Sequence, residues 1–258
     1  MGCRIVQIGF ISSLVFITSV LRAEEPGGEK FLWADTLKSV DIQGFRERGR
    51  EWLPERDGLV LLAGKKTELI RLDDLGANTV QNQSRQLFGK APGISVWESD
   101  GSGMQIGVGS RGLSPNRSWE FNVRQNGYDI AADPFGYPEA YYNPPAEAVE
   151  SITLVRGAAG LQYGPQFGGL LDYRIRQAPA DRKLFVESRQ SGGSYGLWSS
   201  FNALGGTVGR LSYYAFYHHR QADGWREHSR YRSDVLYGSI GYRISEKWKT
   251  SFSYTRST

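Results

Sequence analysis

Hydrophobic and polar residues alternate with a period of two along the last third of the chain. Between residues 236 and 244, one face carries Leu, Ile and Tyr, whereas the other carries Tyr, Ser, Gly and Arg. Such alternation over segments of about ten residues is typical of strands in a membrane β-barrel. It predicts five antiparallel strands, at about residues 183–190, 195–204, 208–220, 234–244 and 248–256.

The connections between these predicted strands differ in length. The segment "QADGWREHSRYRS" is long and charged, whereas "SGGS", "GGTVG" and "SEK" are short. Membrane barrels have short periplasmic turns and longer outer loops, which places the charged segment outside and "GGTVG" and "SEK" on the periplasmic side. A soluble antiparallel sandwich has the same alternation and is the alternative. Five strands leave open edges that lipid cannot satisfy, so we expect either the front part of a longer protein or a truncated product.

Residues 51–178 have the pattern of a compact mixed α/β domain. A helix is predicted from about Thr79 to Phe88, where apolar residues share one face and Pro92-Gly93 follows as a stop. Short β-like runs separated by Gly, Pro, Asn and Asp make up the rest. These runs read "TELIRLDDLG", "ISVWES", "MQIGVGS", "SWEFNVRQNGYDI" and "SITLVRG".

The segment "GVGSRG", from Gly107 to Gly112, fits the G-x-G-x-x-G pattern of dinucleotide-binding turns. That function requires a helix directly after the turn, whose N-terminus receives the pyrophosphate. Here Pro115 and the β-prone "WEFNV" follow instead. We therefore expect these glycines to allow tight turns and close approach of backbone segments.

The N-terminal residues 1–23 have the pattern of a secretory signal peptide, with Arg4 followed by an apolar run and Ala23 at a plausible cleavage point. A short buried helix is the alternative. Removing this segment lowers the formal charge from +4 to +2, because 29 basic residues then face 27 acidic ones, and it removes the single cysteine, Cys3. Residues 24–50 are polar and glycine-bearing, as expected for a flexible tether.

Several function classes lack the residues that they need. The weak positive charge and the absence of long like-charge runs argue against nucleic-acid binding. His218, His219 and His228 lie outside any compact metal-ligand spacing. The chain has no G-x-S-x-G or H-E-x-x-H motif, and no Ser, His and Asp arrangement that indicates an enzyme.

Two long segments carry a resemblance to a known family. The first runs from "RQLFGKAPGISVWESDG" to "RQNGYDI", and the second reads "PPAEAVESITLVRGAAGLQYGPQFGGLLDYRIRQ". Together they resemble the plug domain of TonB-dependent outer-membrane receptors, over about residues 35–258 and most closely over 85–175. The stretches "YGPQ" and "RGLSPNRS" are most similar to the ferric-citrate receptor branch.

The resemblance implies a mixed α/β plug domain followed by the first antiparallel strands of a transmembrane β-barrel that is incomplete in this chain. It divides the chain into a signal peptide (1–23), a periplasmic tether with a TonB box (24–50), the plug (51–178) and barrel strands (179–258). It also implies residence in the outer membrane of a Gram-negative-type bacterium.

The activity implied by the resemblance is energised import of a ferric chelate rather than catalysis. No resident cofactor is implied, because iron would be bound only as the transported chelate. The implied partners are the chelate, outer-membrane lipid and TonB of the inner-membrane energy-coupling complex, which would pair with the tether by strand addition. A vitamin or oligosaccharide cargo, or a secreted β-rich glycan-binding protein, is the alternative. The candidate TonB box is Asp35, Thr36, Leu37, Lys38, Ser39 and Val40.

Candidate ligand residues are aromatic and polar side chains on segments expected to face outward. They are Arg117, Tyr137, Glu139, Tyr141, Tyr142 and Gln162. Arginines suit an anionic chelate, since charge-assisted hydrogen bonds hold carboxylates. The tyrosines could equally pack the plug against the barrel. Gln162 stands where the ferric-citrate receptor carries Arg, and Glu139 adds negative charge, so citrate is not the only candidate cargo. Residues expected to stabilise the plug or contact the barrel are Arg111, Gly112, Glu150, Arg156 and Gly157.

Overall fold

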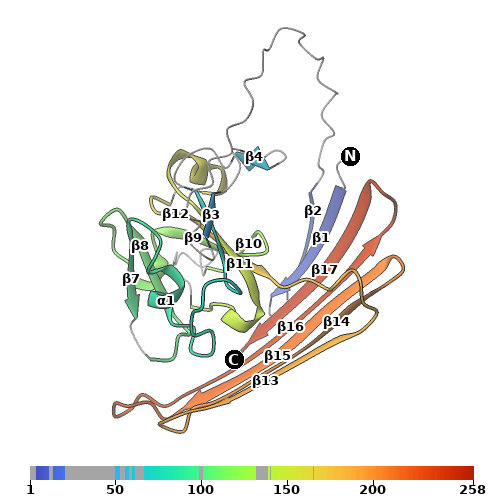
Figure 1. Ribbon diagram of the computed structural model, residues 1–258. Coiled ribbons are helices and arrows are strands. Elements are labelled where there is room, and N and C mark those ends of the chain that lie inside the picture. The colour runs from blue at the N-terminus through green and yellow to red at the C-terminus, as the bar shows by residue number, and fades with distance from the viewer. Residues whose placement is uncertain are drawn as a thin grey trace, which may run out of the picture.

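The computed structural model describes residues 4–11, 14–20, 50–52, 56–57, 60–61, 67–98, 101–131, 139, 141–164 and 166–258. Two main bodies are visible in Figure 1: a compact mixed domain and a long, curved sheet that lies along one side of it. Side chains from both bodies join one core cluster, in which Phe121 and Ile152 of the compact domain accompany Phe201 and Phe216 of the curved sheet.

The compact domain is built on a six-stranded sheet in the order β10-β9-β12-β11-β6-β3. Its strands are β3 (Arg50–Trp52), β6 (Glu68–Arg71), β9 (Phe121–Gln125), β10 (Tyr128–Asp129), β11 (Val149–Val155) and β12 (Gly169–Ile175). β12 runs parallel to β9, and the other pairs are antiparallel. β11 and β12 are central and almost wholly buried, which explains their near-continuous apolar sequences. The short β runs predicted from the sequence are thus confirmed.

Two hairpins accompany this sheet. β4 (Arg56–Asp57) pairs with β5 (Val60–Leu61), and β7 (Ile94–Glu98) pairs with β8 (Ile106–Ser110). β8 is buried along its whole length. The backbone of residues 113–115 lies too close to β8 for a side chain at two of its positions. A Cβ added at Gly107 would lie 2.6 Å from the Pro115 carbonyl oxygen, and one at Gly109 would lie 2.5 Å from the Leu113 carbonyl oxygen. The prediction that "GVGSRG" serves close backbone approach is confirmed.

The helix predicted from Thr79 to Phe88 is only half correct. Helix α1 spans Ser84–Phe88, and residues 79–82 form a turn. Asn82 has a left-handed backbone with φ of 49°, and Gln83 is extended, so a helix cannot continue through them. The buried Asn82 side chain donates to the carbonyls of Gly103 and Pro144 and accepts the Ala146 N–H at 2.6 Å. These distant bonds override the local helical pattern.

Short 3-10 helices also belong to the described part of the compact domain. They are η1 (Asn116–Ser118), η3 (Ala146–Ala148) and η4 (Gly157–Tyr163). None of the described helices combines the length and the apolar character that a membrane-spanning helix needs.

The curved sheet contains five antiparallel strands. They are β13 (Phe185–Gly192), β14 (Trp198–Val208), β15 (Leu211–Ala222), β16 (Tyr231–Arg243) and β17 (Trp248–Ser257). All five predicted strands are confirmed, although their boundaries shift. "GGTVG", for example, was expected to be a turn, yet residues 205–208 belong to β14 because they pair with residues 211–214 of β15.

The two faces of the curved sheet differ in what covers them. Tyr214, Phe216 and Tyr237 are buried on the face toward the compact domain. On the opposite face, Leu236 and Ile240 are 45% and 53% exposed. A sheet of a soluble sandwich exposes mainly polar side chains on its outer face, whereas here the exposed residues include Leu and Ile, and no second sheet covers them among the residues that the structure describes. An outward apolar face is what a strand in contact with lipid requires.

The loops at the two ends of the curved sheet differ in length. Residues 209–210 and 244–247 form the turns at one end, whereas 193–197 and 223–230 connect strands at the other. We call these the short-turn end and the long-loop end.

An apolar hairpin extends the curved sheet beyond β17. β1 (Arg4–Ile11) pairs with β17 in parallel, and β2 (Leu14–Val20) pairs with β1 antiparallel. The hairpin occupies a sheet edge whose backbone groups would otherwise be unpaired. A short buried helix, the alternative to a signal peptide, is therefore wrong for these residues. The signal peptide itself stays a prediction. Of the tether predicted at residues 24–50, only Arg50 is described, and it begins β3; the rest lies outside the described residues.

Candidate functional site

Three of the six predicted ligand residues come together in one polar cluster, formed by Arg117, Glu139 and Tyr141. The Arg117 guanidinium donates to Glu139 Oε2 at 2.8 Å, and the Tyr141 hydroxyl donates to the same oxygen. The guanidinium carbon of Arg117 also lies 5.5 Å from the centroid of the Tyr141 ring, within reach of a cation–π interaction. Two segments more than 20 residues apart in the sequence thus meet at a single carboxylate oxygen.

The backbone around Arg117 explains how this side chain is presented. Arg117 and Ser118 both have left-handed backbones, with φ of 49° and 54°. Ser118 is buried; its hydroxyl donates to the Ile106 carbonyl at 2.6 Å and accepts the Val108 N–H at 3.0 Å. Ser118 thereby anchors η1 to β8, and the unusual conformation leaves the side chain of Arg117 directed to the surface, where it is 41% exposed.

The electrostatics of the cluster favour its ionised state. Hydrogen bonds from Tyr141 and Arg117 lower the pKa of Glu139 below its usual value. The hydrogen bond to Glu139 raises the pKa of both Arg117 and Tyr141. The cluster therefore presents a fixed cation and a phenol whose present acceptor is the carboxylate of Glu139. A carboxylate from outside could take the place of Glu139 with the same geometry.

The other predicted ligand residues lie elsewhere. Tyr142 points inward: its hydroxyl donates to Gln125 Oε1 at 3.1 Å, and burial, with the Tyr237 phenol nearby, raises its pKa far above the usual range. Tyr142 therefore packs against the core cluster and is not part of the polar cluster. The alternative, that the tyrosines pack the plug against the barrel, stays a prediction. Gln162 is exposed on η4 and is not part of the cluster. Tyr137 lies outside the described residues.

The residues predicted to be structural occupy several positions. Arg156 is buried and forms an ion pair with the buried Glu68, and it donates to the Pro92 carbonyl at 2.5 Å. Gly157 begins η4 directly after it. Arg111 and Gly112 form the left-handed turn after β8, with φ of 53° and 80°, and Arg111 is exposed. Glu150 is exposed at the start of β11. Contact of these residues with a barrel wall stays a prediction.

Polar contacts between the two bodies were missed by the sequence analysis. His218 Nε2 lies 3.2 Å from Glu147 Oε2, and both side chains are almost fully buried. Arg220 donates to the Val80 carbonyl at 2.9 Å, and Gln125 donates to Thr255 Oγ1 at 3.0 Å. One signal was available: His218 and Arg220 share the strand face of Tyr214 and Phe216, where polar side chains need partners.

These contacts also show how the compact domain is oriented. His218 and Arg220 are in the half of β15 near the long-loop end, and their partners are Glu147 and Val80. The chain segment that carries Glu139 and Tyr141 leads directly into Glu147. The polar cluster therefore belongs to the part of the compact domain nearest the long-loop end. The described residues contain no group of three or more His, Cys, Asp or Glu side chains that could hold a metal ion.

Residues 63–170 match the family described as the TonB-dependent Receptor Plug Domain. The matched segment runs from before β6 to the start of β12. It therefore contains most of the compact domain and the whole polar cluster.

Solved structures match a larger part of the chain. The ferric citrate transporter FecA, in its unliganded form, shares 28% identity, with a TM-score of 0.56 over 70% of this chain and 29% of that chain. The copper transporter OprC shares 14% identity with a TM-score of 0.59, over 75% of this chain and 30% of that one. The siderophore receptor PirA from Pseudomonas aeruginosa shares 17% identity with a TM-score of 0.56, over 75% and 35%. The chain spans about a third of the length of these proteins, and the last two matches show the fold alone.

Proposed function

Because this chain carries a TonB-dependent receptor plug domain followed by antiparallel strands of that family's barrel, we propose that it takes part in TonB-dependent import of a ferric chelate. Receptors of this family reside in the Gram-negative outer membrane and are transporters rather than enzymes. The class of protein rests on the family match, whereas the cargo and the coupling to TonB are the proposal.

The observation that carries the proposed cargo is the polar cluster of Arg117, Glu139 and Tyr141. Ferric chelates built on carboxylates are anionic, and a carboxylate of the chelate can replace Glu139 as the acceptor for Arg117 and Tyr141. Glu139 then serves as an internal occupant that the chelate must displace. A transporter of ferric citrate is among the matched structures, at 28% identity, which supports the same class of cargo.

Binding of ferric citrate to the purified protein and to single variants tests this proposal. Arg117→Gln removes the charge-assisted hydrogen bond and is expected to weaken binding about tenfold or more. Glu139→Gln removes the competing carboxylate and is expected to strengthen binding. Arg85→Gln is the matched control, since Arg85 is also an exposed arginine near a glutamate, Glu98, at 3.6 Å. Equal affinities for wild type, Arg117→Gln and Glu139→Gln would exclude the cluster as the ligand site.

Coupling to TonB is tested separately from binding. The proposed TonB box, Asp35 to Val40, lies outside the described residues and rests on the sequence. Strand addition depends on backbone hydrogen bonds, so a deletion is more informative than a substitution. Deleting residues 35–40 is expected to abolish uptake of radioactive ferric citrate by cells and to leave binding intact. Uptake at the wild-type rate would place the box elsewhere.

A further inference from the structure

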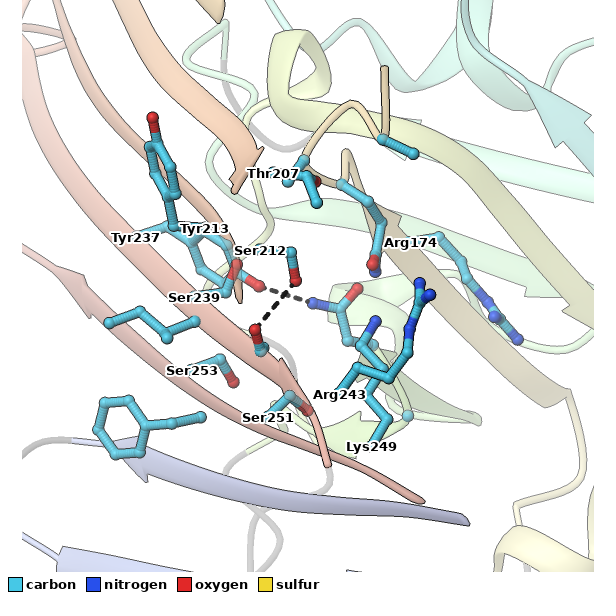
Figure 2. Close-up of a pocket in the computed structure, with 18 of the residues that line it drawn as sticks. Arg174, Thr207, Ser212, Tyr213, Tyr237, Ser239, Arg243, Lys249, Ser251 and Ser253 are labelled. Carbon is cyan, nitrogen blue, oxygen red and sulfur yellow. Dashed lines mark hydrogen bonds between the residues drawn. The ribbon is translucent and has the colours of Figure 1, made fainter. Parts of the chain in front are cut away.

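A cavity of about 490 Å³ lies between the plug and the curved sheet, near the short-turn end. Figure 2 shows side chains of β15, β16 and β17 on one side of it and Arg174 of β12 on the plug side. It is separate from the polar cluster, since neither Arg117 nor Glu139 nor Tyr141 is among its lining residues.

The charges that line this cavity are unbalanced. The lining residues include five cations and a single carboxylate. The cations are Arg124, Arg174, Arg210, Arg243 and Lys249, and the carboxylate is Asp172. Arg124 is already used within the plug, where it donates to Asn122, Gly127 and Tyr163. Arg174 is paired with Asp172, so the three cations of the curved sheet, Arg210, Arg243 and Lys249, give the cavity an excess of positive charge.

Two of these cations are placed directly opposite each other. Arg243 of β16 and Lys249 of β17 are register partners in the antiparallel pair, and both side chains line the cavity. Like charges in this position destabilise a sheet. Among the residues that the structure describes, neither Arg243 nor Lys249 has an ion-pair partner or a side-chain hydrogen bond. An anion between them would convert this repulsion into attraction.

Asp172 does not supply that anion. It lies 3.6 Å from Arg174 and accepts the Gly127 N–H at 2.9 Å, which holds it in the plug sheet. Burial raises its pKa, which shows that its negative charge is costly where it stands. Asp172 therefore does not neutralise the cations of the curved sheet that line the cavity, Arg210, Arg243 and Lys249.

The cavity wall is lined by hydroxyl groups and leaves room for a ligand. Ser212 and Ser251 lie next to the Arg243 and Lys249 pair along the sheet, and Ser239 and Ser253 line the cavity farther along the same strands (Figure 2). Gly241 lies between Ser212 and Ser251. A Cβ at this position would lie 2.7 Å from Ser212 Oγ and 3.2 Å from Lys249 Cε. The small residue lets the lysine stem lie across the sheet. The Ser212 and Ser239 hydroxyls donate to the Gly241 and Tyr214 carbonyls, both at 3.3 Å. The hydroxyls of Ser251 and Ser253, together with the paired cations, suit a ligand with several carboxylate or phosphate oxygens.

We propose that Arg243 and Lys249, with Arg174 and the neighbouring serines, form a binding site for a small soluble anion that carries two or more carboxylate or phosphate groups. The site lies at the short-turn end, opposite the end that holds the polar cluster. In the proposed import function it would hold an anionic cargo on the periplasmic side of the plug. Only that role rests on the proposed function, whereas the anion site rests on the cavity itself.

Lysine modification tests the site without any need for transport. Pyridoxal 5′-phosphate is an anionic aldehyde that forms a Schiff base with lysine, which borohydride fixes for detection by mass spectrometry. We expect Lys249 of the purified chain to be modified at lower reagent concentration than Lys247, which is exposed in the neighbouring turn and serves as an internal control. Citrate and inorganic pyrophosphate, added separately, should each protect Lys249 and leave Lys247 unchanged, and the more effective competitor identifies the preferred anion.

Variants show whether protection comes from the proposed residues. Arg243→Gln is expected to raise the citrate concentration needed for half protection of Lys249 about tenfold or more. Arg117→Gln, in the polar cluster, should leave the citrate concentration for half protection of Lys249 unchanged. The test of the anion site therefore does not depend on whether the polar cluster binds the cargo. Arg243→Lys keeps the charge and should keep protection if Arg243→Gln fails to fold. Lys249 reactivity equal to that of Lys247, or the absence of protection by both anions, would overturn the proposal.

Discussion

At the scale of single residues, Asn82 shows how one side chain can determine a local fold. Its amide satisfies backbone groups of three residues that are distant in sequence, and its own backbone is left-handed. Asparagine tolerates that conformation better than most residues do. The side chain therefore sets both the start of α1 and the position of the segment that leads to Glu147.

Substitutions of Asn82 separate these two contributions. Asn82→Gly keeps the backbone freedom but leaves buried groups unpaired, so the free energy of unfolding should fall by about 1–3 kcal/mol. Asn82→Ala has the same loss and a further cost of roughly 1 kcal/mol for the left-handed backbone. Urea unfolding followed by tryptophan fluorescence measures both values. Equal stability of the two variants would show that the backbone conformation costs nothing at this position.

Asn82 and the glycines of "GVGSRG" also mark what a sequence can predict at this scale. Gly107 and Gly109 were correctly expected to allow close backbone approach, because the absence of a following helix excluded the other reading. The role of Asn82 could not be predicted, since its partners at Gly103, Pro144 and Ala146 are set by the tertiary fold. The same holds for Glu139 and Arg117, whose contact joins two separate loops.

At the scale of elements, a buried ion pair connects β6 with the end of β11. The side chains of Glu68 and Arg156 are 2% and 8% exposed. Removing one partner of such a pair leaves an uncompensated buried charge. Glu68→Gln is therefore expected to lower the free energy of unfolding by about 3–5 kcal/mol.

A second ion pair of the same domain provides the control for Glu68→Gln. Asp73 pairs with Arg176, but the Asp73 side chain is 61% exposed. Asp73→Asn is expected to cost at most about 1 kcal/mol, because water screens the pair. Chemical unfolding of both variants in parallel makes the comparison. A Glu68→Gln effect as small as that of Asp73→Asn would contradict the structural role of the Arg156 pair.

Asp172 on β12 leads to a pH-dependent prediction. Burial raises its pKa above the usual value near 3.8, although the Gly127 hydrogen bond and two arginines partly oppose the shift. The folded protein therefore holds the proton more tightly than the unfolded chain does, and stability falls as the pH rises through the folded pKa. Asp172→Asn keeps an acceptor for the Gly127 N–H and does not titrate.

The stability difference between Asp172→Asn and wild type should therefore grow in favour of the variant as the pH is raised from about 4. Thermal unfolding at a series of pH values measures it. Parallel pH profiles for the two proteins would show that Asp172 has an ordinary pKa in the folded state.

At the scale of the whole molecule, alternation of side chains predicts the strands but not the way in which the two bodies meet. The strands of the curved sheet follow from period-two patterns, because one face of the sheet is exposed and the other packs toward the plug. The docking of the plug depends on side chains such as Gln125 and His218, whose partners come from the other body. Such long-range pairs leave no local pattern in the sequence.

The orientation of the curved sheet can be tested with single cysteines, since Cys3 is the only cysteine of the chain and lies within the predicted signal peptide. Glu227 is in the connection at the long-loop end, and Glu246 is in the turn at the short-turn end. Because outer-membrane barrels have long outer loops and short periplasmic turns, Glu227→Cys should react with a membrane-impermeant maleimide in intact cells. Glu246→Cys should react only after the outer membrane is permeabilised. The reverse pattern would show that the short-turn end faces outward. The polar cluster at Arg117 would then face the periplasm, and the anion site at Arg243 and Lys249 would face the outside of the cell.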